Sequence, residues 1–154
     1  MDNPLVETAL ASVREVFKDM FGLDAAPGPV RIGGQSPTHG WDISGLVGLA
    51  GQAQGIIAVR MPSSLAAAML ERSGVEPGDE RERREMGGHL VAEFTNIVAG
   101  HASSAIADHE VDISPPVVVR GTNHQIAWPD IAPVNILPFS TPSGDFEIVV
   151  CLKL

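Results

Sequence analysis

The stretch LVAEFTNIVAGHASSAI, residues 90–106, lies in the middle of the 154-residue chain and decides its fold. Apolar residues recur in it at helical spacing, so the sequence predicts one long helix from about residue 80 to 108. Asp79, followed three residues later by Glu82, resembles a capping box that would open this helix. A long apolar face explains most of the stretch, but it does not explain Glu93 and Asn96, which stand three residues apart.

With a rotation of about 100° per residue, the side chains of this helix fall on an apolar face and on a polar stripe. The predicted core face contains Met86, Leu90, Phe94, Val98, His101 and Ala105. A polar stripe runs beside it, made of His89, Glu93, Asn96, Gly100 and Ser103. Glu93 and Asn96 are neighbours on this stripe, with β-carbons about 5–6 Å apart. Gly100 costs a helix about 1 kcal/mol relative to alanine, and close approach by another backbone would explain its presence.

The rest of the sequence predicts further elements in separate runs. A helix is expected over 3–22, capped by Asn3 and ended by Gly22, and a second over 63–74, capped by Ser63 or Ser64. Expected strands cover 30–35, 42–51, 54–62, 115–121, 124–128, 134–140 and 145–154, with hairpin turns at 50–55 and 141–144. Because strands cluster rather than alternate with helices, the sequence predicts an α+β fold. A largely antiparallel sheet would pack against long helices in a single domain, 1–154.

The charge and composition of the chain disfavour several classes of partner. The net charge is −9, from 10 basic and 19 acidic residues, which disfavours nucleic acid and anionic membranes. The only basic cluster, RERREM at 81–86, alternates arginine with glutamate, a pattern typical of a solvated helix face. The chain has no apolar run of ~20 residues for a membrane span and no signal-peptide pattern at its start. We therefore expect a cytoplasmic protein.

Other reactive residues do not form a recognisable site. The five histidines, at 39, 89, 101, 109 and 124, have no compact metal-ligand spacing, so we expect no metal or cofactor bound by this chain. His101 is predicted to be a hydrogen-bonded packing residue on the core face. The single cysteine, Cys151, lies among apolar residues and is predicted to be a small core residue. Trp41 and Trp128 are expected to be core or interface anchors.

The segment GHLVAEFTNIVAGHASSAI, followed by DISPPVVVRG, resembles the CheC/CheX/FliY family of chemotaxis phosphatases. The glycine-rich hairpin SGLVGLAGQAQGIIAVRMP, with a helix directly after it, is similar to CheX. The resemblance covers about residues 28–154, and its specific part is the E-x-x-N-I-x-x-G pattern that begins at Glu93. It implies a CheC/CheX-like fold.

The resemblance also implies an activity and a division of roles. This family hydrolyses the aspartyl phosphate of the phosphorylated response regulator CheY. Carried over, Glu93 contacts a lysine of the regulator, and the Asn96 amide positions the attacking water. His89, Gly100 and Ser103 would line the partner-binding surface. The regulator would supply the Mg²⁺. This chain has one E-x-x-N motif, as each CheX subunit does, and CheX forms a homodimer, so the resemblance also implies a homodimer.

Two alternatives remain open. CheC and FliY carry aspartate or serine four residues before the glutamate, where this chain has His89, so the protein could be a non-catalytic module that binds a regulator or flagellar-switch component. The second alternative is a small-molecule enzyme in which a sheet wraps around a central helix, as in hotdog-fold thioesterases. It predicts a deep apolar pocket and a buried stripe, whereas the phosphatase and binding-module hypotheses predict an exposed one.

Overall fold

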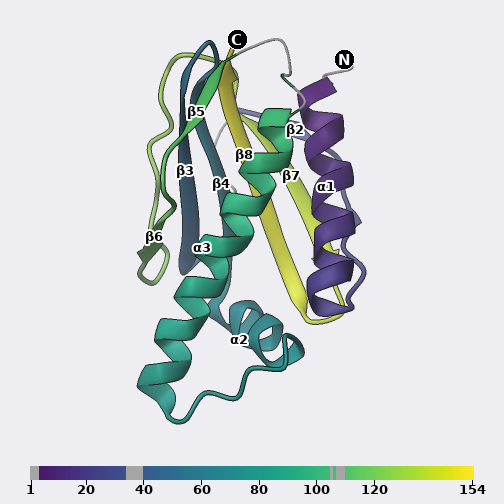
Figure 1. Cartoon of the computed structure of the whole chain (residues 1–154), viewed down its shortest axis with the longest axis vertical. Coiled ribbons are helices and arrows are strands. Elements are labelled where there is room, and N and C mark those ends of the chain that lie inside the picture. The colour runs from purple at the N-terminus through teal and green to yellow at the C-terminus, as the bar shows by residue number, and fades with distance from the viewer. Residues whose placement is uncertain (1–3, 34–39, 105, 107–109) are drawn as a thin grey trace.

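The computed structural model describes residues 4–33, 40–104, 106 and 110–154 (Figure 1). Its helices are α1 (Pro4–Phe21), α2 (Ser63–Arg72) and α3 (Glu80–Ser104). Its strands are β1 (Ala26–Pro27), β2 (Arg31–Ile32), β3 (Ile43–Gly51), β4 (Gln54–Met61), β5 (Val111–Ile113), β6 (Val117–Arg120), β7 (Asn135–Thr141) and β8 (Gly144–Lys153).

All the strands belong to one antiparallel sheet in the order β1-β7-β8-β4-β3-β5. Two further strands pair off this path, β2 with β7 and β6 with β3. β5 lies opposite Leu49–Gly51 and β6 lies opposite Ile43–Leu46, so they follow one another along the same side of β3. The predicted α+β class with an antiparallel sheet is therefore confirmed.

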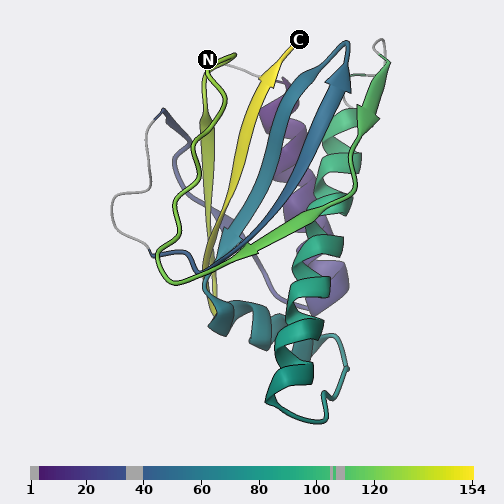
Figure 2. The same ribbon diagram turned by 90° about the vertical axis from the view of Figure 1, so that its left-hand side faces the viewer.

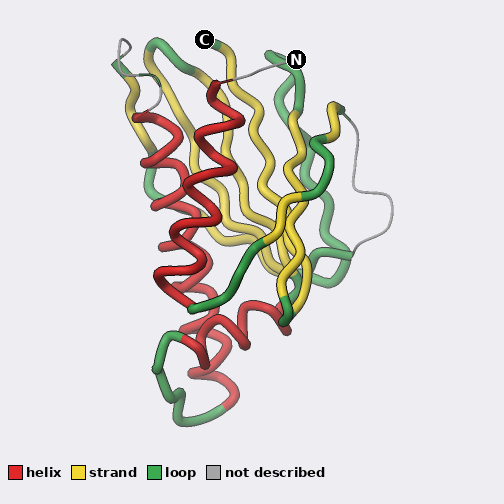
Figure 3. The backbone as a smooth tube through the Cα atoms, turned by 90° about the vertical axis from the view of Figure 1, so that its right-hand side faces the viewer, coloured by secondary structure: helices red, strands yellow, loops and turns green. Residues whose placement is uncertain are grey.

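Helices α1 and α3 lie side by side on one face of the sheet, and α2 lies at its end (Figures 1 and 3). The five phenylalanines of the chain form one chain of ring contacts in the core between these layers. Phe146 of β8 stacks on Phe17 at 5.1 Å and on Phe139 at 5.0 Å, and Phe94 of α3 meets it edge-on at 6.2 Å. Such pairs stabilise a core by about 0.5–1.5 kcal/mol beyond area burial, so Phe94 anchors α3 to the sheet.

The loop of residues 121–134 crosses the opposite face of the sheet (Figure 2). Under it lie a small apolar cluster and two buried charges, Arg60 and Glu147, whose Nη1 and Oε1 atoms are 3.7 Å apart. The Arg60 guanidinium donates to the His124 carbonyl at 3.0 Å and lies 5.9 Å from the Trp128 ring centre. These contacts hold the loop across the face of the sheet, so the strand predicted at 124–128 is wrong.

Several other boundaries differ from the sequence prediction. β1 and β5 were not predicted, and the strand predicted over 30–35 is only Arg31–Ile32 within the described residues. α3 ends at Ser104, and its predicted last residues, 105, 107 and 108, lie outside the described part of the chain. At the start of α3, Asp79 accepts from the Glu82 amide as predicted, but the Glu82 carboxylate accepts from the amide of Gly78.

The cap of α2 comes from another part of the chain. Neither Ser63 nor Ser64 caps the helix, because the N-cap residue is Pro62, which has no capping side chain. Instead, the carboxylate of Asp42 accepts from the Ser63 amide and from the Ser63 hydroxyl, the latter at 2.6 Å. This carboxylate satisfies a free amide of the first turn.

Candidate active site

A close contact between α3 and β3 sets which face of α3 is exposed. Thr95 is fully buried and its side chain lies where a β-carbon on Gly45 would be. The Thr95 hydroxyl donates to the carbonyl of Val91, one turn earlier, at 2.7 Å. Because Gly45 has no side chain, α3 approaches the sheet closely at this point. The buried residues of α3 are Gly87, Leu90, Val91, Phe94, Thr95, Val98, Ala99 and Ala102.

The polar stripe lies on the side of α3 away from the sheet. Glu93, Asn96 and His89 are exposed, while Gly100 and Ser103 are half-buried. Neither Glu93 nor Asn96 has a side-chain hydrogen bond or ion pair with any described residue. The stripe is thus brought together as predicted, and it presents a free carboxylate and a free amide about one helical turn apart.

Part of the predicted core face is wrong. His101 is exposed, whereas Met86 is half-buried and packs against the core as predicted. Ala105 lies outside the described residues. The buried face is rotated toward Val91, Thr95 and Ala102, because the small side chains there let the helix backbone approach the sheet.

Gly100 and Ser103 complete the stripe about one and two turns beyond Asn96. A β-carbon at Gly100 would meet nothing within 4 Å, so the close backbone approach that was expected there is not made by a described part of this chain. The Ser103 hydroxyl donates to the Gly100 carbonyl at 2.9 Å, and the hydroxyl oxygen keeps its capacity to accept. Because neither position carries a large side chain, a partner can approach this end of the stripe closely.

Other candidate residues have structural roles. His124 lies 2.7 Å from the Ser44 hydroxyl through Nε2 and 2.9 Å from the Gly121 carbonyl through Nδ1, so it ties the covering loop to β3. Burial raises the pKa of the Cys151 thiol, which agrees with its predicted core position. His39 and His109 lie outside the described residues.

The described part of the chain contains neither a cluster of metal-ligating side chains nor a membrane-spanning helix. No group of three or more His, Cys, Asp or Glu side chains there could hold a metal ion. None of the described helices is long and apolar enough to cross a membrane.

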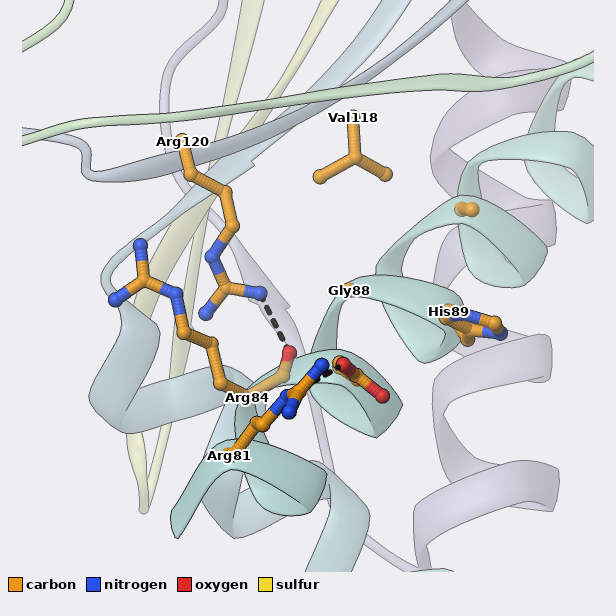
Figure 4. A pocket seen from close by; sticks show the side chains of 8 residues that line it. Arg81, Arg84, Gly88, His89, Val118 and Arg120 are labelled. Atoms are coloured by element: carbon orange, nitrogen blue, oxygen red, sulfur yellow. Dashed lines mark hydrogen bonds and ion pairs between the residues drawn. The ribbon is translucent and has the colours of Figure 1, made fainter.

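A groove that the sequence analysis missed runs beside the stripe. It lies between the first turns of α3 and strand β6, and it is lined by Arg81, Arg84 and His89 from α3 and by Val118 and Arg120 from β6 (Figure 4). The alternating charges of RERREM predicted only a solvated face, and Arg81 and Arg84 are indeed exposed. Arg120 is 36 positions further along the chain, so only the tertiary structure brings it to the same place.

Comparison with known proteins assigns the chain to a family. The family described as "Chemotaxis phosphatase CheX" matches residues 43–140, which is more than half of the chain and includes all of α3. The chain belongs to the CheX family. The family resemblance read from the E-x-x-N segment is therefore confirmed, and no curated protein sequence matches the chain.

Solved CheX-like structures share the fold over nearly the whole chain. A CheC-like superfamily protein from Shewanella sp. PV-4 is 29% identical, with a TM-score of 0.86 and complete coverage of both chains. The chemotaxis protein CheX from Vibrio vulnificus is 30% identical, with a TM-score of 0.84 over 98% of this chain and all of that one.

A third relative was crystallised with a partner. CheX from Borrelia burgdorferi, in a complex with CheY, BeF3 and Mg²⁺, is 26% identical, with a TM-score of 0.78 over 97% of this chain and 98% of that one. These matches confirm the predicted CheC/CheX-like fold and connect the family with CheY.

Proposed function

We propose that this protein is a cytoplasmic phosphatase that hydrolyses the aspartyl phosphate of a CheY-type response regulator, with Glu93 and Asn96 as its catalytic pair. The observation that carries the proposal is the exposed, unpaired Glu93–Asn96 pair on α3, in a chain of the CheX family. A macromolecular substrate requires an exposed site, and both residues lie on the solvent side of the helix. This exposure is the opposite of the buried stripe that a hotdog-type enzyme requires.

The two side chains suit different parts of the reaction. The carboxylate of Glu93 can bind a lysine of the regulator and so fix the docking position. The amide of Asn96 both donates and accepts hydrogen bonds, so it can hold a water in line with the phosphorus atom. Attack by this water breaks the bond between phosphorus and the aspartyl oxygen and releases phosphate and a free aspartate. Phosphoryl transfer requires mainly such positioning, and charge stabilisation, from a protein.

The Mg²⁺ belongs to the regulator in this proposal, and no step of this chain's own residues runs through it. In the proposal, the regulator carries both the phosphoryl group and the cation. This protein then has to position only its Asn96 amide, its Glu93 carboxylate and the attacking water.

Phosphate release tests the proposal directly. A CheY-type regulator from the same organism is phosphorylated with a small phosphodonor, the donor is removed, and dephosphorylation is followed with and without this protein. We expect wild type to accelerate the loss. Asn96→Ala should lower the rate by about 10²–10³-fold while still binding, since losing one preorganised donor has effects of that size. Glu93→Ala should weaken binding as well.

Glu15→Ala is a matched control for Glu93→Ala, because Glu15 is an exposed glutamate on α1. It should leave dephosphorylation and binding unchanged. If wild type accelerates no regulator, or if Asn96→Ala keeps the full rate, the catalytic assignment is wrong.

A non-catalytic binding module is the second candidate, and His89 is the observation that favours it. This residue is exposed on the stripe one turn before Glu93, where an imidazole replaces the smaller polar residue of CheC and FliY. Under this alternative, a regulator binds without faster dephosphorylation. His89→Asp would then be the first substitution to restore turnover.

We also propose that the protein acts as a homodimer. Sedimentation velocity at several concentrations tests this, and a single species at the monomer mass would contradict it.

A further inference from the structure

The groove beside the stripe concentrates positive charge in an acidic protein. Its volume is about 650 Å³, within the ~300–1,000 Å³ typical of binding sites. Three of the chain's 10 basic residues, Arg81, Arg84 and Arg120, line it, although the net charge of the chain is −9. Val118 and Ala92 add apolar side chains to its lining.

The three arginines of the groove have different partners. Arg120 extends from β6 toward α3 and donates from Nη1 to the carbonyl oxygen of Arg84 at 2.7 Å (Figure 4). Gly88 makes room for it, because a β-carbon there would lie 3.2 Å from this nitrogen. Among the described residues that line the groove, Glu85 is the only carboxylate, and it lies 3.4 Å from Arg81. The guanidinium of Arg84 has no partner among the described residues.

The positive charges of Arg84 and Arg120 lie close enough to repel one another. The pKa of Arg120 is lowered, first by burial and then by repulsion from Arg84, and attraction by Asp42 only partly offsets this. An acceptor with negative charge would relieve the repulsion and occupy the free donors of Arg84. Guanidinium groups bind carboxylates with two parallel hydrogen bonds, so a carboxylate suits this place.

We propose that the groove receives an acidic segment of the response regulator while the regulator's phosphoryl site lies over Asn96. This inference rests on the proposed function and extends it to a second contact region. His89 borders both the groove and the stripe, so the two surfaces are continuous. Arg84 precedes Asn96 by 12 residues, or about 18 Å along the helix. A partner footprint of ~800 Å², roughly 30 Å across, is wide enough to reach both positions.

The groove would determine partner choice more than catalytic rate. The protein as a whole repels acidic partners through its net charge of −9. A local patch of arginine offsets this repulsion in one place only, and it therefore selects both a partner with a matching acidic segment and the orientation in which it binds. A small free anion is less favoured, because the groove is open along the surface that also bears the stripe.

The test is a charge reversal with a matched control on the same helix. Arg84→Glu should raise the Kd for the regulator, and KM in dephosphorylation, by about tenfold or more, and it should reduce the salt dependence of binding. The kcat should change little, because the groove does not touch the reacting atoms. Arg83→Glu changes charge equally, one residue away, but Arg83 faces a different side and pairs with Glu80. It should leave Kd and KM unchanged.

The outcomes separate this inference from the proposed function. If wild type binds the regulator without hydrolysis and Arg84→Glu still loses binding, the docking groove stands and the phosphatase proposal fails. If Arg84→Glu and Arg83→Glu bind the regulator as wild type does, the groove proposal is overturned, whatever the activity. Equal losses of binding in Arg84→Glu and Arg83→Glu would also overturn the groove proposal, since binding would then depend only on net charge. Failure of every cognate regulator to bind wild type overturns both.

Two further measurements sharpen the result. Acidic surface residues of the regulator are replaced by lysine one at a time, and one of them should restore binding to Arg84→Glu. A coupling of this kind identifies the facing pair. Inorganic phosphate is titrated in parallel as a probe for a small-anion site. If Arg84 matters for phosphate binding but not for the regulator, the groove takes a small anion and the docking proposal is wrong.

Discussion

The side chain of Thr95 occupies the space that a β-carbon on Gly45 would need, and this contact joins the central helix to the sheet. Thr95 is the residue between Phe94, which enters the core, and Asn96, which faces solvent. The contact therefore fixes the rotation of α3 about its axis. The direction in which the candidate catalytic amide points depends on it.

Gly45→Ala should destabilise the protein by about 1–3 kcal/mol, as overpacking of a tight core position does. It should also reduce dephosphorylation more than its stability loss explains, because α3 must shift or turn. Chemical denaturation and the phosphate-release assay measure the two effects. Gly48→Ala on the same strand is the control, since its β-carbon would make an ordinary 3.5 Å contact with Ser114. Equal effects of both substitutions would contradict the special role of Gly45.

Gly100→Ala should have opposite effects on stability and on docking. The new β-carbon meets nothing within 4 Å, so α3 should gain about 1 kcal/mol in helix propensity. If a regulator backbone approaches the stripe there, the same methyl group should weaken binding. Thermal unfolding and a binding titration measure the pair of changes. A loss of stability would show that space around Gly100 is tighter than the structure indicates.

Asp42→Ala should destabilise the protein by about 1 kcal/mol, and at most about 2, because it removes the cap of α2. Ser63→Ala should cost less, since the bond from the Ser63 amide to Asp42 remains. Equilibrium urea unfolding of both variants gives the comparison. A larger loss for Ser63→Ala than for Asp42→Ala would mean that the hydroxyl, not the carboxylate, holds the helix start.

Glu147→Ala should destabilise the protein by about 3–5 kcal/mol, because it leaves Arg60 buried without its charge partner. Burial lowers the pKa of Arg60 more than the attraction of Glu147 raises it, so the cation already carries a desolvation cost. The double variant Arg60→Met with Glu147→Leu should therefore lose much less than Glu147→Ala alone. Unfolding free energies of the variants test this, and additive losses would argue against it.

The sequence predicted the elements whose signals are local. The helix at the N-terminus, the glycine-rich hairpin of β3 and β4 and the long helix α3 each have a clear period and end signals, and all three are present. The stripe followed from the same period, because residues three and four apart share a helix face. The roles assigned to Glu93 and Asn96 came from the family resemblance and stay predictions.

The errors arose where distant residues decide the structure. His101 was placed on the core face because helical period alone could not show how close Thr95 lies to Gly45. The cap of α2 comes from Asp42, 21 positions before Ser63, so no local pattern reveals it. The segment 124–128 has strand-forming residues, but its contacts with Arg60 make it a covering loop. The docking groove needs Arg120, which the sequence places far from Arg84.

The exposed position of the stripe allows the candidate site to evolve independently of the fold. Both members of the candidate pair project into solvent from a single helix, and within the described chain neither supports the fold through a side-chain hydrogen bond or ion pair. Replacing either side chain should therefore cost the fold almost nothing, and regaining it requires only one codon. Substitutions can therefore change the candidate site without changing the fold. If the proposed function holds, a lineage can lose the phosphatase activity, keep the fold for binding a regulator, and later regain the activity without any change in the core.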